Sequence, residues 1–158
     1  MPIFRNRRGR LVGTVWTDGC CYRNGSGNPK AGYGTYWGDE HYLNSYGPLP
    51  SSNATNNRAE LYAVYYAINQ AIDEGVKYLR IRTDSAYVKN IFTDWIYYWE
   101  NNGWKNARGH PVKNQRLIKE IMELIDEHID VDFIHILRDS EKENSEADTL
   151  AKMGAKQY

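Results

Sequence analysis

Cysteine is scarce in this chain, and its placement excludes two kinds of stabilising site. Only two cysteines occur among the 158 residues, and they are adjacent, Cys20 and Cys21. Disulfide frameworks and zinc sites need more ligands at wider spacings, so neither is predicted. So few cysteines are consistent with a reducing environment. The sequence therefore predicts an intracellular protein and leaves open whether it is nuclear, cytoplasmic or mitochondrial.

Long apolar runs and an excess of charge of one sign are also missing. No run approaches the roughly 20 residues that span a bilayer, and no charged segment followed by an apolar one marks a signal peptide. We therefore expect neither a membrane partner nor secretion. The 20 basic and 20 acidic residues balance, so any surface that binds a polyanion must be local.

One segment departs from this balance. The first ten residues contain Arg5, Arg7, Arg8 and Arg10 and no acid. Charge runs at a terminus are usually solvated, so residues 1–10 are expected to form a poorly ordered basic arm. A phosphate-contacting or targeting role is the alternative.

Hydrophobic periodicity predicts a single domain over residues 11–158. Three strands come first, and helices and strands then alternate, which is typical of an α/β fold whose mixed sheet is flanked by helices. Strands are expected at 11–18, 33–37, 42–46, 78–84 and 131–137, with 38–40 as a hairpin turn. Helices are expected at 58–72, 117–128 and 145–155, and residues 85–101 are expected to form one helix or two short ones.

Four acidic residues stand where such a fold gathers functional groups. Asp18 and Asp84 end predicted strands, and Glu60 and Asp148 lie early in predicted helices. Clustered carboxylates disfavour one another's ionisation unless cations are present. Magnesium prefers such oxygen ligands, and two ions about 4 Å apart catalyse phosphoryl displacement. The quartet therefore predicts a divalent-metal site.

The segments around these acids carry a family resemblance. From about residue 11 to 156, the chain resembles the catalytic domain of type 1 ribonuclease H in its cellular, eukaryotic-like form. The matching motifs, in order, are Thr17-Asp18-Gly19-Cys20-Cys21, Ala31-Gly32-Tyr33-Gly34, Thr55-Asn56-Asn57-Arg58-Ala59-Glu60-Leu61, Thr83-Asp84-Ser85, Asn101-Asn102-Gly103-Trp104-Lys105 and Asn144-Ser145-Glu146-Ala147-Asp148-Thr149-Leu150-Ala151.

The resemblance implies a five-stranded ribonuclease H-like sheet of three antiparallel strands followed by parallel ones. It also implies hydrolysis of the RNA strand of RNA–DNA hybrids, which leaves 5′-phosphate and 3′-hydroxyl ends. Asp18 and Asp148 would hold the magnesium ion that activates water, and Asp18, Glu60 and Asp84 the ion beside the leaving oxygen. Manganese is the expected substitute. A monomer with no small-molecule cofactor is expected.

Contacts to the hybrid follow from the same resemblance. Asn24, Asn56 and Asn57 would read RNA 2′-hydroxyls in the minor groove, although such residues also serve as turn residues and helix caps. Thr55 and Asn114 would bind a phosphate of the DNA strand. An arginine often completes that pocket, and Asn53 replaces it here. The expected channel for the DNA strand is Tyr87, Trp95 and Trp99, with core packing as the alternative, and the expected basic loop is Lys105, Arg108 and Lys113.

The chain departs from the family at one catalytic position. Ten residues before the last aspartate, where the family commonly has a histidine, stands Arg138. Arginine stays protonated, so it cannot shuttle protons, but it can neutralise a phosphate. His135 lies inside the predicted strand and is expected in the core or on the sheet surface. We therefore expect a genuine but slowed nuclease.

Two other functions fit parts of the pattern. The replacement of the family's arginine by Asn53 and of its histidine by Arg138 would suit a non-catalytic hybrid-binding module. The complete quartet of acids argues against this function. DNA-cutting transposases and integrases share the sheet and carboxylates. They lack the Thr55–Glu60 motif and the aromatic segment after Asp84, so this reading ranks lower.

Overall fold

The fold is organised by one mixed sheet. The computed structural model describes residues 2–50 and 54–157. The strand order is β4-β3-β2-β5-β6, and β1 pairs with the start of β2. Strands β1 to β4 are connected by antiparallel pairing, whereas β2, β5 and β6 run parallel. The strands are β1 (Ile3–Arg5), β2 (Leu11–Tyr22), β3 (Lys30–Tyr36), β4 (Ser45–Pro48), β5 (Tyr78–Thr83) and β6 (Asp130–His135).

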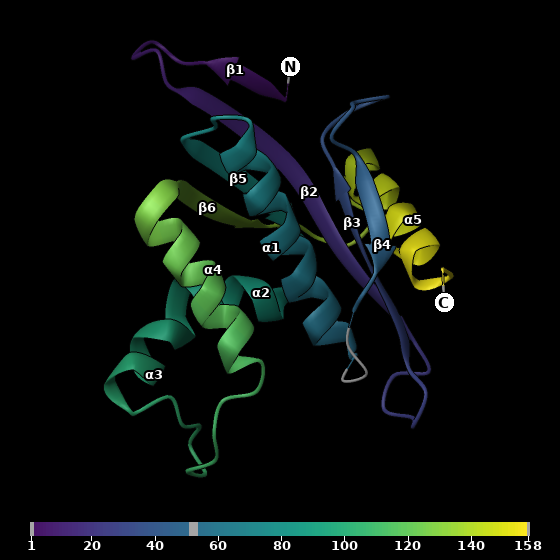
Figure 1. The fold of residues 1–158 in the computed structure, drawn as a ribbon, viewed down its shortest axis with the longest axis vertical. Helices are drawn as coiled ribbons and strands as arrows, with labels where there is room; N and C mark the ends of the chain where they lie inside the picture. The colour runs from purple at the N-terminus through teal and green to yellow at the C-terminus, as the bar shows by residue number, and fades with distance from the viewer. Residues whose placement is uncertain (1, 51–53, 158) are drawn as a thin grey trace.

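Helices cover both faces of this sheet (Figure 1). The main core lies between the sheet and helices α1 and α4, where Val15, Leu79 and Ile81 meet Leu61 and Ile118. Helix α5 packs on β3 and β2 from the other side. The predicted α/β class is thereby confirmed. The helices are α1 (Asn56–Asp73), α2 (Ala86–Asn90), the π-helical η1 (Ile91–Trp95), α3 (Ile96–Asn101), α4 (Gln115–His128) and α5 (Lys142–Ala155). Among the described helices, none has the length and apolar character that crossing a membrane requires.

The fourth strand begins three residues later than predicted. Residues 42–46 were expected to pair across a short turn, but β4 starts at Ser45. The Asn44 side chain explains the shift, because it accepts a hydrogen bond from the Trp37 backbone at 2.6 Å and donates to the Gly38 carbonyl at 2.7 Å. These bonds replace ladder pairing and widen the turn.

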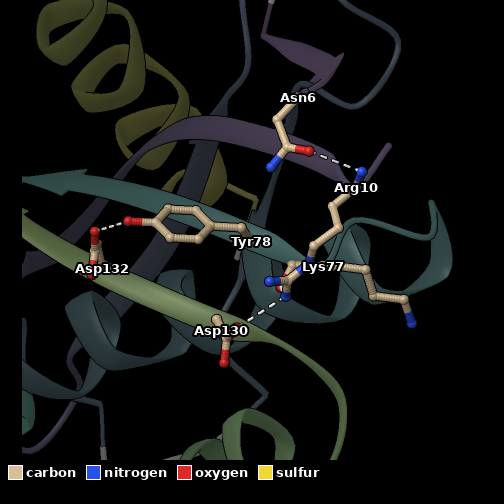
Figure 2. Close-up of polar contacts among 6 residues, drawn as sticks. All are labelled: Asn6, Arg10, Lys77, Tyr78, Asp130 and Asp132. Atoms are coloured by element: carbon tan, nitrogen blue, oxygen red, sulfur yellow. Dashed lines mark hydrogen bonds and ion pairs between the residues drawn. The ribbon is translucent and has the colours of Figure 1, made fainter. Parts of the chain in front are cut away.

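The N-terminal segment corrects a second expectation. Instead of a poorly ordered arm, β1 pairs with residues 11–13 of β2, with Ile3 opposite Gly13. The Asn6 side chain accepts bonds from the backbone of Arg8 and Arg10, each at 3.0 Å, and closes the turn. The guanidinium of Arg10 then bonds Asp130 at 3.0 Å, beside the Tyr78–Asp132 contact (Figure 2). Sequence spacing could not reveal a partner 120 positions away.

Glycines let α5 approach the sheet closely. A β-carbon on Gly32 would lie 2.1 Å from the Ala155 backbone nitrogen, and one on Gly34 would lie 2.6 Å from the Ala147 carbonyl. Neither distance is possible without moving the helix. These two positions therefore set how near α5, which carries Asp148, lies to β3, where Gly34 pairs with Asp18 of β2.

Replacing Gly32 by alanine is expected to lower the free energy of unfolding by about 2–4 kcal/mol, because backbone atoms cannot yield to the added methyl group. Urea unfolding followed by circular dichroism measures this. Gly27→Ala is the matched control, because a β-carbon there meets nothing within 4 Å. Equal stability of the two variants would contradict the close approach.

Candidate active site

Asp18 and Asp84 meet at one edge of the sheet because β2 runs past the end of β5. The last parallel pair joins Trp16 and Arg82, so each aspartate lies two residues beyond it. Asp18 is buried, with 4% of its surface exposed, and its carboxylate accepts a bond from the Gly19 nitrogen at 3.0 Å. Asp84 is half-buried.

Glu60 reaches this edge from α1 because the helix start lies directly on β2. A β-carbon on Gly19 would be 2.4 Å from the Glu60 nitrogen, so only glycine permits the contact. One carboxylate oxygen each from Asp18, Glu60 and Asp84 lies within 4.8 Å of the other two. The structure thus brings three of the four predicted acids together.

The electrostatics of this cluster favour a bound cation. Burial raises the pKa of Asp18 to about 7, and the charges of Asp84 and Asp148 add to the effect. Burial and the neighbouring Asp18 charge raise the pKa of Glu60 well above its ordinary value. Glu60 Oε2 is buried without a hydrogen-bond partner in the described residues. A buried carboxylate oxygen without a hydrogen-bond partner, beside carboxylates that repel it, fits the binding of a divalent metal ion.

Asp148 and Arg138 line the same hollow without joining the tight cluster. The hollow measures about 390 Å³, and its wall includes all four acids, Arg138 and Lys152. Lys152 lies one helical turn after Asp148, and its Nζ bonds the Asp148 carboxylate at 2.8 Å. Sequence reasoning missed Lys152, which the spacing of four residues within a predicted helix could have indicated.

Two further residues touch Asp84. Asn144, 1% exposed, donates its side-chain amide to the Asp84 carboxylate at 3.2 Å. His135, at the end of β6, has Nε2 3.3 Å from the Asp84 carbonyl oxygen. It is exposed, so it lies on the surface beside the site. Asn144 stands four positions before Asp148, and this helical spacing could have identified it.

The three asparagines expected at the minor groove lie along the rim. Asn56 and Asn57 line the hollow, and the Asn24 side chain accepts a bond from the Asn56 nitrogen at 3.3 Å. Thr55, rather than an asparagine, is the N-cap of α1, because its hydroxyl accepts from the Arg58 nitrogen at 3.1 Å. The amides of Asn56 and Asn57 are therefore not consumed as the helix cap.

The expected channel residues form a row of aromatic rings. Successive centroids lie 6.1 Å apart for Tyr87 and Trp95, 5.9 Å for Trp95 and Trp99, and 5.8 Å for Trp99 and Trp104. Trp95 is 38% exposed, whereas the other three pack partly against the core. The core-packing alternative therefore holds for Tyr87 and Trp99. Trp95, the last residue of η1, is open to solvent, and the channel for the DNA strand stays a prediction.

The basic residues lie on the loop between α3 and α4. Lys105, Arg108 and Lys113 are all exposed, and an isolated bridge between Lys105 and Pro111 closes the loop. Asn114, at the end of the loop, is held by Arg58 and Tyr87. Asn53, expected beside that pocket, lies outside the described residues.

A salt bridge behind the acids fixes the segment that carries Arg138. Glu141, the N-cap residue of α5, receives two bonds from Arg82, at 3.0 and 2.6 Å, and one from the Trp16 ring nitrogen at 2.8 Å. Arg82 and Trp16 lie two residues before Asp84 and Asp18. Glu141 therefore ties the helix of Asp148 to both strands that carry the aspartates.

Glu141→Gln is expected to lower the free energy of unfolding by about 1–3 kcal/mol, because it leaves the half-buried Arg82 without a counter-charge. Chemical denaturation measures the loss. Lys142→Ala is the control, because the ion pair between Lys142 and Asp39 is exposed to solvent. It should change the free energy of unfolding by less than about 1 kcal/mol. An equal effect of both substitutions would show that Glu141 is not an anchor.

Comparisons with known proteins agree with this arrangement. The sequence model of the family described as RNase H matches residues 12–156. The chain is 41% identical to human Ribonuclease H1 over 144 residues, which cover 90% of this chain and 50% of the human protein. It thus spans about half the length of that relative. With Ribonuclease H of Neisseria meningitidis it shares 38% identity over 156 residues, covering 91% and 95% of the two chains.

Solved structures show the same fold. The crystal structure of LC11-RNase H1 in complex with RNA/DNA hybrid superposes with a TM-score of 0.67 at 21% identity, covering 91% of this chain and 96% of that one. The family model spans nearly all of the described residues and includes every acid of the quartet. The chain therefore belongs to the RNase H family.

Proposed function

We propose that this protein is an endonuclease that hydrolyses the RNA strand of RNA–DNA hybrids. The observation that carries the proposal is the meeting of Asp18, Glu60 and Asp84 within 4.8 Å, with Asp148 on the same wall, in a chain of this family. Relatives named ribonuclease H and a related structure bound to a hybrid support the choice of substrate. The products would carry 5′-phosphate and 3′-hydroxyl ends.

Two magnesium ions, or manganese in their place, would supply water activation and neutralise the charge on the leaving oxygen when bound. Asp18 and Asp148 would hold one, and Asp18, Glu60 and Asp84 the other. The chain's own groups prepare these ligands, because Asn144 fixes one oxygen of Asp84. Arg138 would neutralise the scissile phosphate and would not move a proton, since a guanidinium keeps its protons in proteins.

The hybrid would lie across the α1 start and the α3–α4 loop. Asn24, Asn56 and Asn57 would contact 2′-hydroxyls, and the open ring of Trp95 would face the DNA sugars. Thr55 and Asn114 would hold a DNA phosphate, with the exposed cations of the α3–α4 loop nearby. A monomer working inside the cell, without a small-molecule cofactor, stays a prediction.

Parallel digestion of labelled hybrid, duplex DNA and duplex RNA with magnesium tests the function. Only the RNA strand of the hybrid should be cut, and Glu60→Gln should abolish cutting. Tight hybrid binding without cleavage in magnesium or manganese would support a non-catalytic binding module instead. Cutting of duplex DNA would indicate the transposase-like alternative.

A further inference from the structure

Arg58 is a half-buried cation without an acidic partner among the described residues. Its side chain leaves the first turn of α1 and is partly covered. The ion pairs found in residues 2–50 and 54–157 do not include it. A partly desolvated guanidinium without a carboxylate is costly unless an anion completes it.

Its contacts direct the guanidinium toward the residues expected to hold a DNA phosphate. Nη1 donates to the Asn114 side-chain oxygen at 3.2 Å, and the Asn114 amide donates to the Tyr87 hydroxyl at 3.1 Å. The Arg58 backbone nitrogen donates to the Thr55 hydroxyl oxygen at 3.1 Å. One arginine therefore links Thr55 to Asn114, which lie 59 positions apart.

The amide of Asn114 is engaged at both ends and is not spent on capping α4, where no side-chain cap bond forms. Asn114 adopts a left-handed backbone with φ 61°, which asparagine tolerates better than most residues. Its side chain thus holds the guanidinium in place. Within residues 2–50 and 54–157, one of the five N–H donors of the Arg58 side chain finds an acceptor. The other four are left for an anion, and a guanidinium fork matches phosphate oxygens.

We infer that Arg58 supplies the cation of the DNA-phosphate pocket. In the family an arginine often completes this pocket at the position where this chain has Asn53, and Arg58 takes over its role. This inference rests on the proposed function. The ligand is one backbone phosphate of the DNA strand, bound through charge-assisted hydrogen bonds beside the Thr55 hydroxyl. Arg58 therefore contributes to substrate positioning and not to the chemical step.

A thermodynamic cycle between Arg58 and single phosphates tests this. Hybrids that carry one uncharged methylphosphonate at successive DNA linkages are titrated by fluorescence anisotropy, in an Asp84→Asn background that blocks cleavage. In the protein that retains Arg58, replacing the phosphate at one particular DNA linkage by methylphosphonate should weaken binding of the hybrid about tenfold. Arg58→Gln should weaken binding of the unmodified hybrid by a similar factor, and neutralising that linkage should then cost nothing further.

The control is Arg116→Gln, which removes an almost fully exposed cation near the start of α4 and should leave the sensitive linkage unchanged. If the sensitive linkage keeps its full penalty in Arg58→Gln, the inference is overturned while the pocket stands. If no linkage is sensitive in the protein that retains Arg58, the proposed pocket itself fails. If Arg58→Gln does not fold, Arg58→Lys takes its place in the same cycle. Because lysine lacks the guanidinium fork, neutralising the sensitive phosphate should then weaken binding at least threefold less than it does in the parent. An undiminished loss of binding would overturn the inference.

Discussion

Asp18→Asn is expected to abolish cleavage and, at the same time, to stabilise the metal-free protein. The loss of rate should reach about 10³-fold, equivalent to about 4 kcal/mol of transition-state stabilisation, because Asp18 is the residue that would touch both ions. The gain in stability at pH 8 should be on the order of 4 kcal/mol, since a pKa raised from 3.8 to about 7 means that ionising this buried carboxyl opposes folding. Asparagine can still accept the bond from Gly19.

Single-turnover cleavage of a labelled hybrid and urea unfolding in EDTA measure the two effects. Glu146→Gln is the matched control, because it removes an exposed acid from α5 outside the hollow and should change neither quantity. A variant that is inactive but less stable than the parent in EDTA would show that the acids are not held together against their repulsion.

The same raised pKa values fix the sign of the pH dependence. Between about pH 4 and 7, the folded protein binds more protons at Asp18 and Glu60 than the unfolded chain does. Stability of the metal-free protein should therefore fall as the pH rises through this window. Asp18→Asn should flatten the slope. Magnesium added at pH 8 should restore stability to the parent and not to the variant.

Arg138→His is expected to accelerate single-turnover cleavage by at least about tenfold, which is a part of the about 10²–10⁴-fold that well-positioned general acid–base catalysis supplies. Arg138 is exposed and lines the hollow that contains the acids. A histidine there could accept and return a proton near neutral pH, whereas arginine cannot. The rate of RNA-strand cleavage under enzyme excess measures the effect.

Arg138→Gln distinguishes charge from proton transfer. If arginine neutralises the scissile phosphate, glutamine should be slower than the parent, while histidine should be faster. A histidine variant no faster than the parent would mean that Arg138 does not limit the reaction. Glu141 is unchanged in both variants, so the loop they share stays anchored to β5.

The acids themselves could be read from the chain because local patterns determine where strands and helices end. Apolar runs stop at Asp18 and Asp84, and the Thr55–Glu60 motif marks a helix start, so local sequence patterns alone place three of the ligands. Their burial and mutual distance were not predictable, since both depend on how closely α1 sits on Gly19.

Contacts between distant segments were the features that sequence reasoning missed or mistook. The N-terminal arginines looked like a solvated arm, but Arg10 finds Asp130 on a strand that folding brings alongside. Arg58, in the motif at the start of α1, bonds Asn114, which lies 56 positions away in the chain. No periodic pattern connects such partners.

The sequence alone determined the fold class, the family and the identities of the carboxylates, because periodicity and short motifs act within a few residues along the chain. Only the tertiary structure decided which cations face those carboxylates, how the loop of Arg138 is fixed by Glu141, and what completes the phosphate pocket. The physical reason is that side-chain charges interact over a few ångströms through space, and close packing at Gly19, Gly32 and Gly34 determines which ones come within that range.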